Sequence, residues 1–576
     1  MDQQLSGTVA VRSHGATHPV TAWTYRVRVW EYLMRQWRPY FVSGIAEAVG
    51  GPLLYLLALG LGLGSLISSR GTAVLGGVRY VDYIAPALLC AAALQIAFSE
   101  CSFGAFGRIK WQRTLWGITS TPVTPEVAAD AHVMYISTRL GLSAVLYYLV
   151  LLAFGAAGGP AGVLMIPIAV LTAMSVGVWI LALSAVLDDD APTAFNLVLR
   201  FGVIPASLFS ASFFPISQLP WAVRWLAVAS PLWHGNELAR DAALGGLPGW
   251  QVTMHLVVLV ALLVAVSRWR GGGSGSGWRP DMAWQASDRV AVTESTGQAP
   301  RDAPHPRAGA SGELLLRIIP VRMYAGRSHV VMERSLHTSR TFKWTLISGF
   351  FEPLFYLLAM GAGMGSLIGT VQGPTGPVAY AAFIAPGLLA TSAMNGAVFD
   401  STVNVFFKLR YAKTYDAMLA TSLGPMDVAL GEIGWALGRG AAYAVTFEIV
   451  MAAMGLLYSP WAALAVPGAI LIAFGFAAVG MAICTFLRTF QHLDWVTMSL
   501  MPMFLFSTTF YPLDVYPRAV QILVECLPLY HGIELIRGLT LGAVDVSMLG
   551  HAAYFVVMAV VGVAVTARRL ERLLLT

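Results

Sequence analysis

Two nearly identical decapeptides hold the residues of this chain whose types and spacing could do chemistry. "PLWHGNELAR" ends at Arg240, "PLYHGIELIR" ends at Arg537, and seven of their ten positions are identical. Each places a histidine three positions before a glutamate, so the two side chains share a face if the segment is helical. Such a pair could be half of a metal site or an acid–base pair. The four residues are His234, Glu237, His531 and Glu534.

No third ligand lies near either pair in the sequence, so we predict neither a metal site nor a catalytic centre. The role of the pairs therefore depends on the elements that position them, and these are membrane spans. Of the 576 residues 57% are hydrophobic and 11% are charged, whereas a soluble chain carries about 25% charged residues.

Apolar runs long enough to cross a bilayer recur along the chain, six in each half. We therefore expect an all-α polytopic membrane protein of about twelve transmembrane helices. The runs lie near 41–66, 82–104, 128–156, 162–187, 197–214, 252–267, 346–368, 379–402, 428–457, 461–486, 495–512 and 547–567.

The two halves repeat one another in sequence as well as in hydropathy. "PLLYLLALGLGLGSLI" in the first half matches "PLFYLLAMGAGMGSLI" in the second, and "SASFFP" matches "STTFYP" ahead of each decapeptide. The matches keep the same order, which indicates a tandem duplication. We assign residues 1–269 and 314–576 to two six-span domains. The segment 270–313 between them is rich in Gly, Ser and Pro and is predicted to be a flexible cytoplasmic linker.

Positive charge is concentrated on one side of the predicted spans. Arg and Lys are frequent before the first span, after the second span of each half and near the C-terminus, whereas the opposite loops carry few. The positive-inside rule then places both termini in the cytoplasm. This orientation accounts for the net charge of +6, so we expect no nucleic-acid partner. The decapeptides fall on the outer side, in segments broken by proline, and we interpret them as re-entrant helices of an outer gate.

The loop after the second span of each half mixes cations with aromatic residues, in "FGRIKWQR" and "FFKLRYAK". Pro125 and Pro425 suit the first turn of the helix that follows each loop, and Thr124 would cap the first of these helices. Two interpretations remain open: a short interfacial helix that docks a cytoplasmic partner, or a basic loop that anchors the chain at lipid headgroups. The candidate contact residues are Arg108, Lys110, Arg113, Lys408, Arg410 and Lys413.

Several acidic residues fall at or near membrane depth. Ionisable groups are costly there and are candidates for function. They could line a pathway, pair with Arg139 and Arg439, or lie at the membrane interface. The main candidates are Glu47, Glu100, Glu352 and Asp400, and Glu432 and Glu448 are two more.

The sequence carries no motif for chemistry that would drive transport. It lacks the GxxxxGK[ST] phosphate loop of nucleotide-binding domains and the HExxH and GxSxG patterns of hydrolases. We therefore expect that this chain does not hydrolyse ATP by itself, is not an enzyme and binds no cofactor of its own.

Together these motifs resemble the membrane subunits of type-2 ABC exporters, and among them the group of drug-resistance and nodulation-factor permeases. The resemblance covers both halves and excludes the linker and the extreme N-terminus. It implies six spans per unit, a coupling helix after the second span and re-entrant helices between the fifth and sixth. The motifs that carry it are "EPLFYLLAMGAGMG", "FIAPGLL", "FYPLDVYP" and "PLYHGIELIRG", with looser versions in the first half.

The resemblance also implies how such a protein works. Two units form a pathway across a bacterial plasma membrane, and two copies of a separate ATPase subunit, which binds the ATP and magnesium, drive export of an amphipathic drug, lipid or glycolipid. Here one chain would supply both units, so each decapeptide would serve one outer gate.

Two other function classes remain open. A secondary transporter of the major facilitator type also has six plus six spans, but neither basic loop carries the Gly-Asp-Arg-type signature of that family. A membrane enzyme acting on lipid-linked sugars would need a cluster of carboxylates or histidines in an interfacial loop, and only the His-x-x-Glu pairs qualify.

Overall fold

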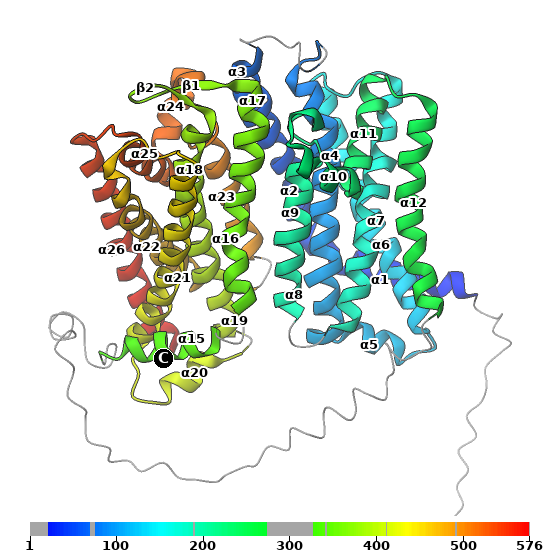
Figure 1. The fold of residues 1–576 in the computed structure, drawn as a ribbon. Coiled ribbons are helices and arrows are strands. Elements are labelled where there is room, and N and C mark those ends of the chain that lie inside the picture. Colours follow the sequence, from blue (N-terminus) through cyan, green and yellow to red (C-terminus); the bar gives the residue numbers. More distant parts are fainter. Residues whose placement is uncertain are drawn as a thin grey trace, which may run out of the picture.

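The computed structural model of the chain is built almost entirely of helices (Figure 1). It describes residues 21–68, 75, 77–187, 191–272, 326–339, 343–410, 412–489 and 492–574. The expected all-α membrane fold with a repeated unit is confirmed. The predicted linker, 270–313, lies outside the described residues from residue 273 onward.

The first half begins with an amphipathic helix that buries Val29, Leu33 and Trp37. Its α-helices are α1 (Ala22–Trp37), α2 (Phe41–Tyr55), α3 (Gly64–Ser68), α4 (Tyr80–Ser99), α5 (Thr114–Thr119), α6 (Pro125–Ala153), α7 (Met165–Val186), α8 (Ala191–Val198), α9 (Ile204–Phe209), α10 (Trp221–Ala229), α11 (Pro231–Leu244) and α12 (Gly249–Gly272). Short 3-10 segments are η1 (Arg38–Tyr40), η6 (Pro160–Leu164) and η8 (Ile216–Gln218), and π-helical segments are η2 (Leu56–Leu63), η4 (Glu100–Gly104), η5 (Gly107–Trp111) and η7 (Leu199–Val203).

The second half repeats this order and adds one antiparallel hairpin, β1 (Thr370–Gly373) with β2 (Gly376–Ala379). Its α-helices are α15 (Ser328–Ser339), α16 (Lys343–Leu358), α17 (Gly365–Ile368), α18 (Tyr380–Phe399), α19 (Val405–Arg410), α20 (Thr414–Leu419), α21 (Pro425–Ala453), α22 (Ala465–Cys484), α23 (His492–Phe506), α24 (Arg518–Glu525), α25 (Pro528–Leu541) and α26 (Ser547–Leu574). The π-helical segments are η10 (Ala359–Met364) and η11 (Asp400–Asn404), and the 3-10 segments are η12 (Pro460–Leu464) and η13 (Leu513–Val515).

Helix starts follow the local sequence. Pro125 and Pro425 occupy the first turn of α6 and α21, where a missing N–H costs no hydrogen bond. Thr124 caps α6 as predicted, because its hydroxyl accepts the Val127 N–H at 3.4 Å. The two helices have the same length, 29 residues, in both halves.

Nine helices within the described residues are long and apolar enough to cross a membrane, or ten if the bent pair α24–α25 counts as one span. The fifth expected span of each half is a shorter apolar helix, Thr193–Phe209 or Trp495–Phe506. The helix α21 carries four charged residues, which lower its hydropathy. The expected twelve helices are therefore present as elements, but not all meet a length and hydropathy test.

Both second spans change to π-helical geometry at their acidic residue. The segment η4 begins at Glu100 and η11 begins at Asp400. Single π turns inside helices are frequent at functional sites. The acids in the second spans therefore lie where the helix geometry of each half is interrupted.

The short helices α5 and α20 lie at the same end of the molecule as the C-terminal end of α26, and α11 and α25 lie at the opposite end (Figure 1). Two seams join the halves. In one, α2 packs against α23, and in the other α16 packs against α8, η7 and α9.

Candidate functional site

An ion pair joins the second and third spans in each half. Glu100 pairs with Arg139 and also lies 3.5 Å from Arg108. Asp400 pairs with Arg439 in the second half. All five side chains are at least four-fifths buried, so each pair ties two spans together at membrane depth. These contacts are the arginine pairing that the sequence left as one alternative.

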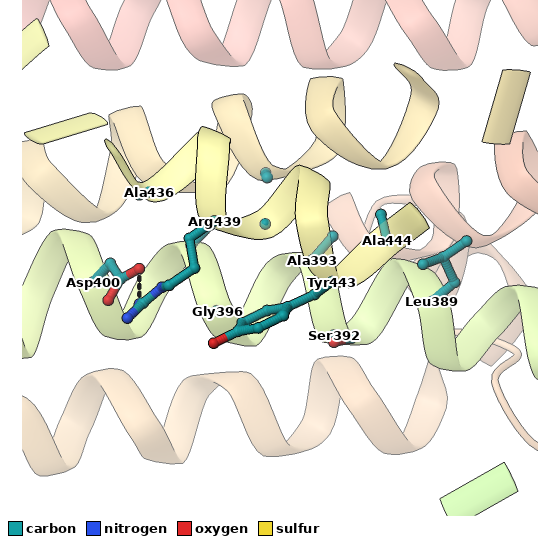
Figure 2. Close-up of a pocket in the computed structure, with 12 residues that line it drawn as sticks. Leu389, Ser392, Ala393, Gly396, Asp400, Ala436, Arg439, Tyr443 and Ala444 are labelled. Atoms are coloured by element: carbon teal, nitrogen blue, oxygen red, sulfur yellow. Dashed lines mark ion pairs between the residues drawn. The ribbon is translucent and has the colours of Figure 1, made fainter. Parts of the chain in front are cut away.

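The second half surrounds its pair with further polar groups. Figure 2 shows Arg439 reaching from α21 to Asp400, with the Tyr443 ring beside the pair and Ser392 farther along the same cavity. A cavity of about 20 Å³ lies between them, which is room for roughly one water molecule. Towards the α20 end, Glu432 receives two hydrogen bonds from Lys408, at 2.8 and 2.6 Å.

The expected short helices follow the two basic loops directly. Arg113 and Lys413 precede α5 and α20 in the left-handed backbone conformation, with φ of 52° and 45°. This conformation is uncommon for residues other than glycine, and both halves keep it. Leu115 anchors α5 in the protein, and Tyr415 anchors α20.

The six basic candidates divide by their contacts. Arg108 and Lys408 turn inward to Glu100 and Glu432. The others lie at the surface, where Arg410 also donates to the Leu487 carbonyl at 3.2 Å. The surface members are Lys110, Arg113, Arg410 and Lys413.

A groove of about 560 Å³ lies between α1 and α5 in the first half. It places Gly117 and Thr121, which follow the basic loop, opposite Arg28 of the amphipathic helix. Two tyrosines add aromatic rings to its lining, and aliphatic residues, a proline and a second threonine complete it. The residues around it include Tyr25, Arg28, Tyr32, Gly117 and Thr121.

At the opposite end, the glutamate of each decapeptide pairs with the arginine that follows it by three positions. Glu237 is 2.8 Å from Arg240, and Glu534 is 2.7 Å from Arg537. Each guanidinium also lies 4.0 Å from the centre of an aromatic ring of the second span, Tyr83 or Phe383. Both arginines are buried, so these contacts offset the cost of removing their charge from water.

The same arginines hold a turn of unusual geometry after the fifth span. Ala211 and Thr508 have φ of 55° and 62°, although neither is glycine. Arg240 donates to the Ala211 carbonyl, and Arg537 donates to the Thr508 carbonyl at 2.6 Å. Backbone in this region costs free energy and persists only where its surroundings hold it. In each half the arginine of the decapeptide, Arg240 or Arg537, stabilises this turn.

The histidine of each decapeptide meets a second histidine on the sixth span. His234 Nδ1 lies 2.7 Å from His255 Nδ1, and His531 Nδ1 lies 2.8 Å from His551 Nδ1. One imidazole of each pair must donate and the other accept. The pair therefore links α11 to α12, and α25 to α26.

Three kinds of site residue were absent from the sequence-based candidates: Arg240 and Arg537, the left-handed turn residues, and the second histidines. The histidines had a usable signal, because His255 follows His234 by 21 positions and His551 follows His531 by 20. The turn residues had none, since Ala211 and Thr508 are not residue types that favour positive φ.

The two halves interlock at the end of the molecule that carries α11 and α25. Phe214 of the first half lies against Gly363 of the second, and Tyr511 of the second lies against Gly62 of the first. The Tyr80 hydroxyl lies 3.8 Å from the sulfur of Met364, across the same boundary. Phe214 and Tyr511 directly follow the turns at Ala211 and Thr508, which Arg240 and Arg537 hold. These turns therefore position the aromatic residues that pack against the other half.

The remaining acidic candidates lie at different places. Glu352 of α16 lies in a seam between the halves, 4.0 Å from Arg200. Glu448 lies on α21 beside the exposed Ile449. Glu47 lies on α2, and its side chain is outside the described residues. Within the described ranges, no group of three or more His, Cys, Asp or Glu is placed to hold a metal ion.

Comparison with known proteins agrees with this arrangement. Residues 25–244 and 329–541 each match the ABC-2 type transporter family. Nodulation protein J of Rhizobium leguminosarum bv. trifolii is 34% identical over 235 residues, which are 40% of this chain and 87% of that protein. The protein of the same name from Rhizobium meliloti is 31% identical over 34% of this chain and 75% of its own length.

A third relative is the inner membrane transport permease YadH of Escherichia coli, 26% identical over 36% of this chain and 78% of its own length. The resemblance seen in the sequence motifs is thereby confirmed. The chain belongs to the ABC-2 type transporter family and carries the membrane domain of that family twice.

Proposed function

We propose that this chain forms the membrane-spanning pathway of an ATP-driven exporter, with two permease units in one polypeptide. The observation that carries the proposal is the reciprocal packing of two ABC-2 domains, in which Phe214 lies against Gly363 and Tyr511 against Gly62. In this proposal the substrate crosses the membrane along the boundary between the two packed permease units.

The chain works with an ATP-binding subunit, as its family implies. In our proposal two copies of that subunit bind, one at α5 and one at α20, and they hold the ATP and magnesium. The groove between α1 and α5 supports this, because it offers arginine, aromatic and small residues beside the short helix. In the second half, α20 presents the exposed Asp416 at the position of Trp116, so the two docking surfaces differ in charge.

Movement of α5 and α20 would reach the outer turns through the second and third spans. The Glu100–Arg139 and Asp400–Arg439 ion pairs join these spans. The second and third spans of each half would therefore move together rather than slide past each other. Tyr83 and Phe383, on the same second spans, contact the arginines that hold the outer turns. A shift of the second span would therefore alter the outer closure.

The substrate in this proposal is an amphipathic molecule: a drug, a lipid or a glycolipid. We place the chain in a bacterial plasma membrane with both termini in the cytoplasm. The concentration of Lys and Arg beside α5 and α20 supports that orientation, and so does the position of the C-terminal end of α26 on the same side (Figure 1).

The test is to purify the full chain from its native membrane in mild detergent, and to measure the mass and ATP turnover of whatever accompanies it. We expect a complex of one chain with two copies of a subunit that carries a phosphate loop. A chain that purifies without an ATPase, and that moves substrate down an ion gradient in vesicles, would instead establish a secondary transporter.

A further inference from the structure

The seam between α16 and the fifth span of the first half contains a carboxylate that is only weakly paired. Glu352 and Arg200 are 4.0 Å apart, at the limit of an ion pair. No hydrogen bond to Glu352 is present among the described residues, and its side chain is 34% exposed. A carboxylate at membrane depth is costly unless it is paired, so Glu352 has capacity for a second positive partner.

Aromatic rings from both halves pack together in the same seam. The Phe201 ring lies 5.1 Å from the Phe351 ring and 6.3 Å from the Phe355 ring. Phe209 lies 6.2 Å from Phe355. Ring faces attract cations as well as apolar groups. A seam that holds one weakly paired carboxylate and four phenylalanines therefore matches a molecule that is apolar and carries a positive charge.

Arg200 is held by more than Glu352. It also interacts electrostatically with Tyr443 of α21, so it keeps a polar neighbour when Glu352 turns to another cation. Exchange of partners at Glu352 would therefore leave no isolated charge in the seam.

The other seam shows no such pair among the side chains that the structure describes. The duplication places Gly51 where the second half has Glu352, and Thr497 where the first half has Arg200. Gly51 lies near Met501, and Gly50 lies near Met498. Among the described side chains the charged site therefore lies on one side of the boundary, and the positions that the duplication aligns with it carry no charge.

Four other described acids of the spanning helices are either paired or lie beside an exposed residue. Glu100 and Asp400 have close arginine partners, and Glu432 has Lys408. Glu448 neighbours Ile449, which is 62% exposed on the outside of the helical body. Glu352 alone among these five combines a weak pair with a position between the halves.

We propose that Glu352 binds the cationic group of an amphipathic organic substrate, while Phe201, Phe351 and Phe355 contact its apolar part. Arg200 neutralises the carboxylate when the site is empty. The inference deepens the proposed function by naming the substrate class and the side of the boundary that recognises it. Binding itself needs neither ATP nor the partner subunit, so it can be measured separately from transport.

The experiment uses the full chain in lipid nanodiscs and two probes of nearly equal size and opposite charge, tetraphenylphosphonium and tetraphenylborate. Equilibrium binding is measured for each after subtraction of binding to empty discs. We expect the unchanged chain to prefer the cation and Glu352→Gln to bind it about tenfold more weakly. Arg200→Thr, which copies the other seam, should bind the cation more tightly because Glu352 loses its competitor.

Glu448→Gln is the matched control and should leave binding of the cation unchanged. Phe201→Leu keeps all charges and should also weaken binding of the cation. This second variant tests the site independently if Glu352→Gln proves to fold poorly. Equal binding of the cation by the unchanged chain and Glu352→Gln overturns the proposal. A preference for tetraphenylborate that is lost in Arg200→Thr also overturns it, because recognition would then belong to Arg200. If these binding results hold but transport proves independent of ATP, the proposed function fails and this site remains.

Discussion

The ring of Tyr511 lies against Gly62 so closely that no methyl group fits on the glycine. Phe214 makes the matching contact with Gly363. Each half thus packs an aromatic residue that follows its fifth span against a glycine of the other half. The two glycines are needed here for their lack of a side chain, and the contact joins the repeated domains at the end away from α5 and α20.

Substitution of Gly62 should open this contact. Tyr511 is buried and its hydroxyl is 2.7 Å from that of Tyr516, so the ring cannot simply turn aside. We expect Gly62→Val to lower the free energy of unfolding by about 1–3 kcal/mol, the usual cost of overfilling a packed site. Thermal denaturation in detergent measures it. Gly365→Val is the control, because a side chain there meets open space. Equal melting of the two variants would show that the contact is not tight.

The decapeptide arginines should be among the most sensitive positions in the chain. Arg537→Ala removes the partner of Glu534 and the donor to the strained Thr508 carbonyl. Loss of one partner from a buried pair costs about 3–5 kcal/mol, and we expect a loss of that order in thermal unfolding. Arg518→Ala, at a side chain that is 75% exposed, should change stability by less than about 0.5 kcal/mol. A loss of stability in Arg537→Ala no larger than that in Arg518→Ala would contradict the role of Arg537 in holding this turn.

The first histidine pair predicts a dependence of stability on pH. Burial, with a smaller contribution from His255, lowers the pKa of His234 from its ordinary value of 6.5 to about 4. The neutral imidazole therefore stabilises the fold above pH 6.5, and this contribution is lost as the pH falls from 6.5 towards 4. Glu237, on the same helix, is held by Arg240 and stays beside the pair.

Thermal unfolding between pH 7 and 5 checks this expectation. The unchanged chain should lose up to about 2 kcal/mol relative to His234→Gln, whose side chain at this position does not titrate. The comparison between the two removes the contribution of other groups, including the His531–His551 pair. Parallel pH profiles for the two proteins would mean that His234 is not held neutral by the fold.

The groove between α1 and α5 should be required for docking of the ATP-binding subunit. Gly117 is exposed in this groove, so Gly117→Trp would fill it without removing any charge. We expect Gly117→Trp to lose the ATPase copy at α5 while the copy at α20 remains, so that gel filtration shows a complex smaller by one subunit, while the chain itself melts as before. Val257→Trp, at a residue of α12 that is 59% exposed, should leave the complex intact. Unchanged association of Gly117→Trp would place docking elsewhere.

Much of the fold could be predicted from the sequence, because repeats and apolar runs depend on local order along the chain. The position of α5 and α20 followed from the basic loops and from Pro125 and Pro425. The partners of the decapeptide residues could not be predicted in the same way. The spacing of three residues placed Glu237 on the same helix face as His234. Glu237 instead pairs with Arg240, and His234 pairs with His255 of another helix.

The sequence shows that Gly51 stands where the second half has Glu352, but the pairing of Glu352 with Arg200 could not be predicted from it. Glu352 and Arg200 are far apart in the chain, and only the packing of α16 against the fifth span brings them together. The left-handed turns at Ala211 and Thr508 depend on buried arginines that arrive from later helices.

The central claim is that one chain with two ABC-2 domains exports its substrate at the expense of ATP. Inside-out vesicles that contain the chain and its ATP-binding subunit test this most directly, with uptake of a fluorescent amphipathic cation as the measured quantity. Our account predicts uptake that requires ATP, continues after ionophores collapse all ion gradients, and stops in Gly117→Trp. Uptake that ignores ATP and stops with the ionophores would contradict it.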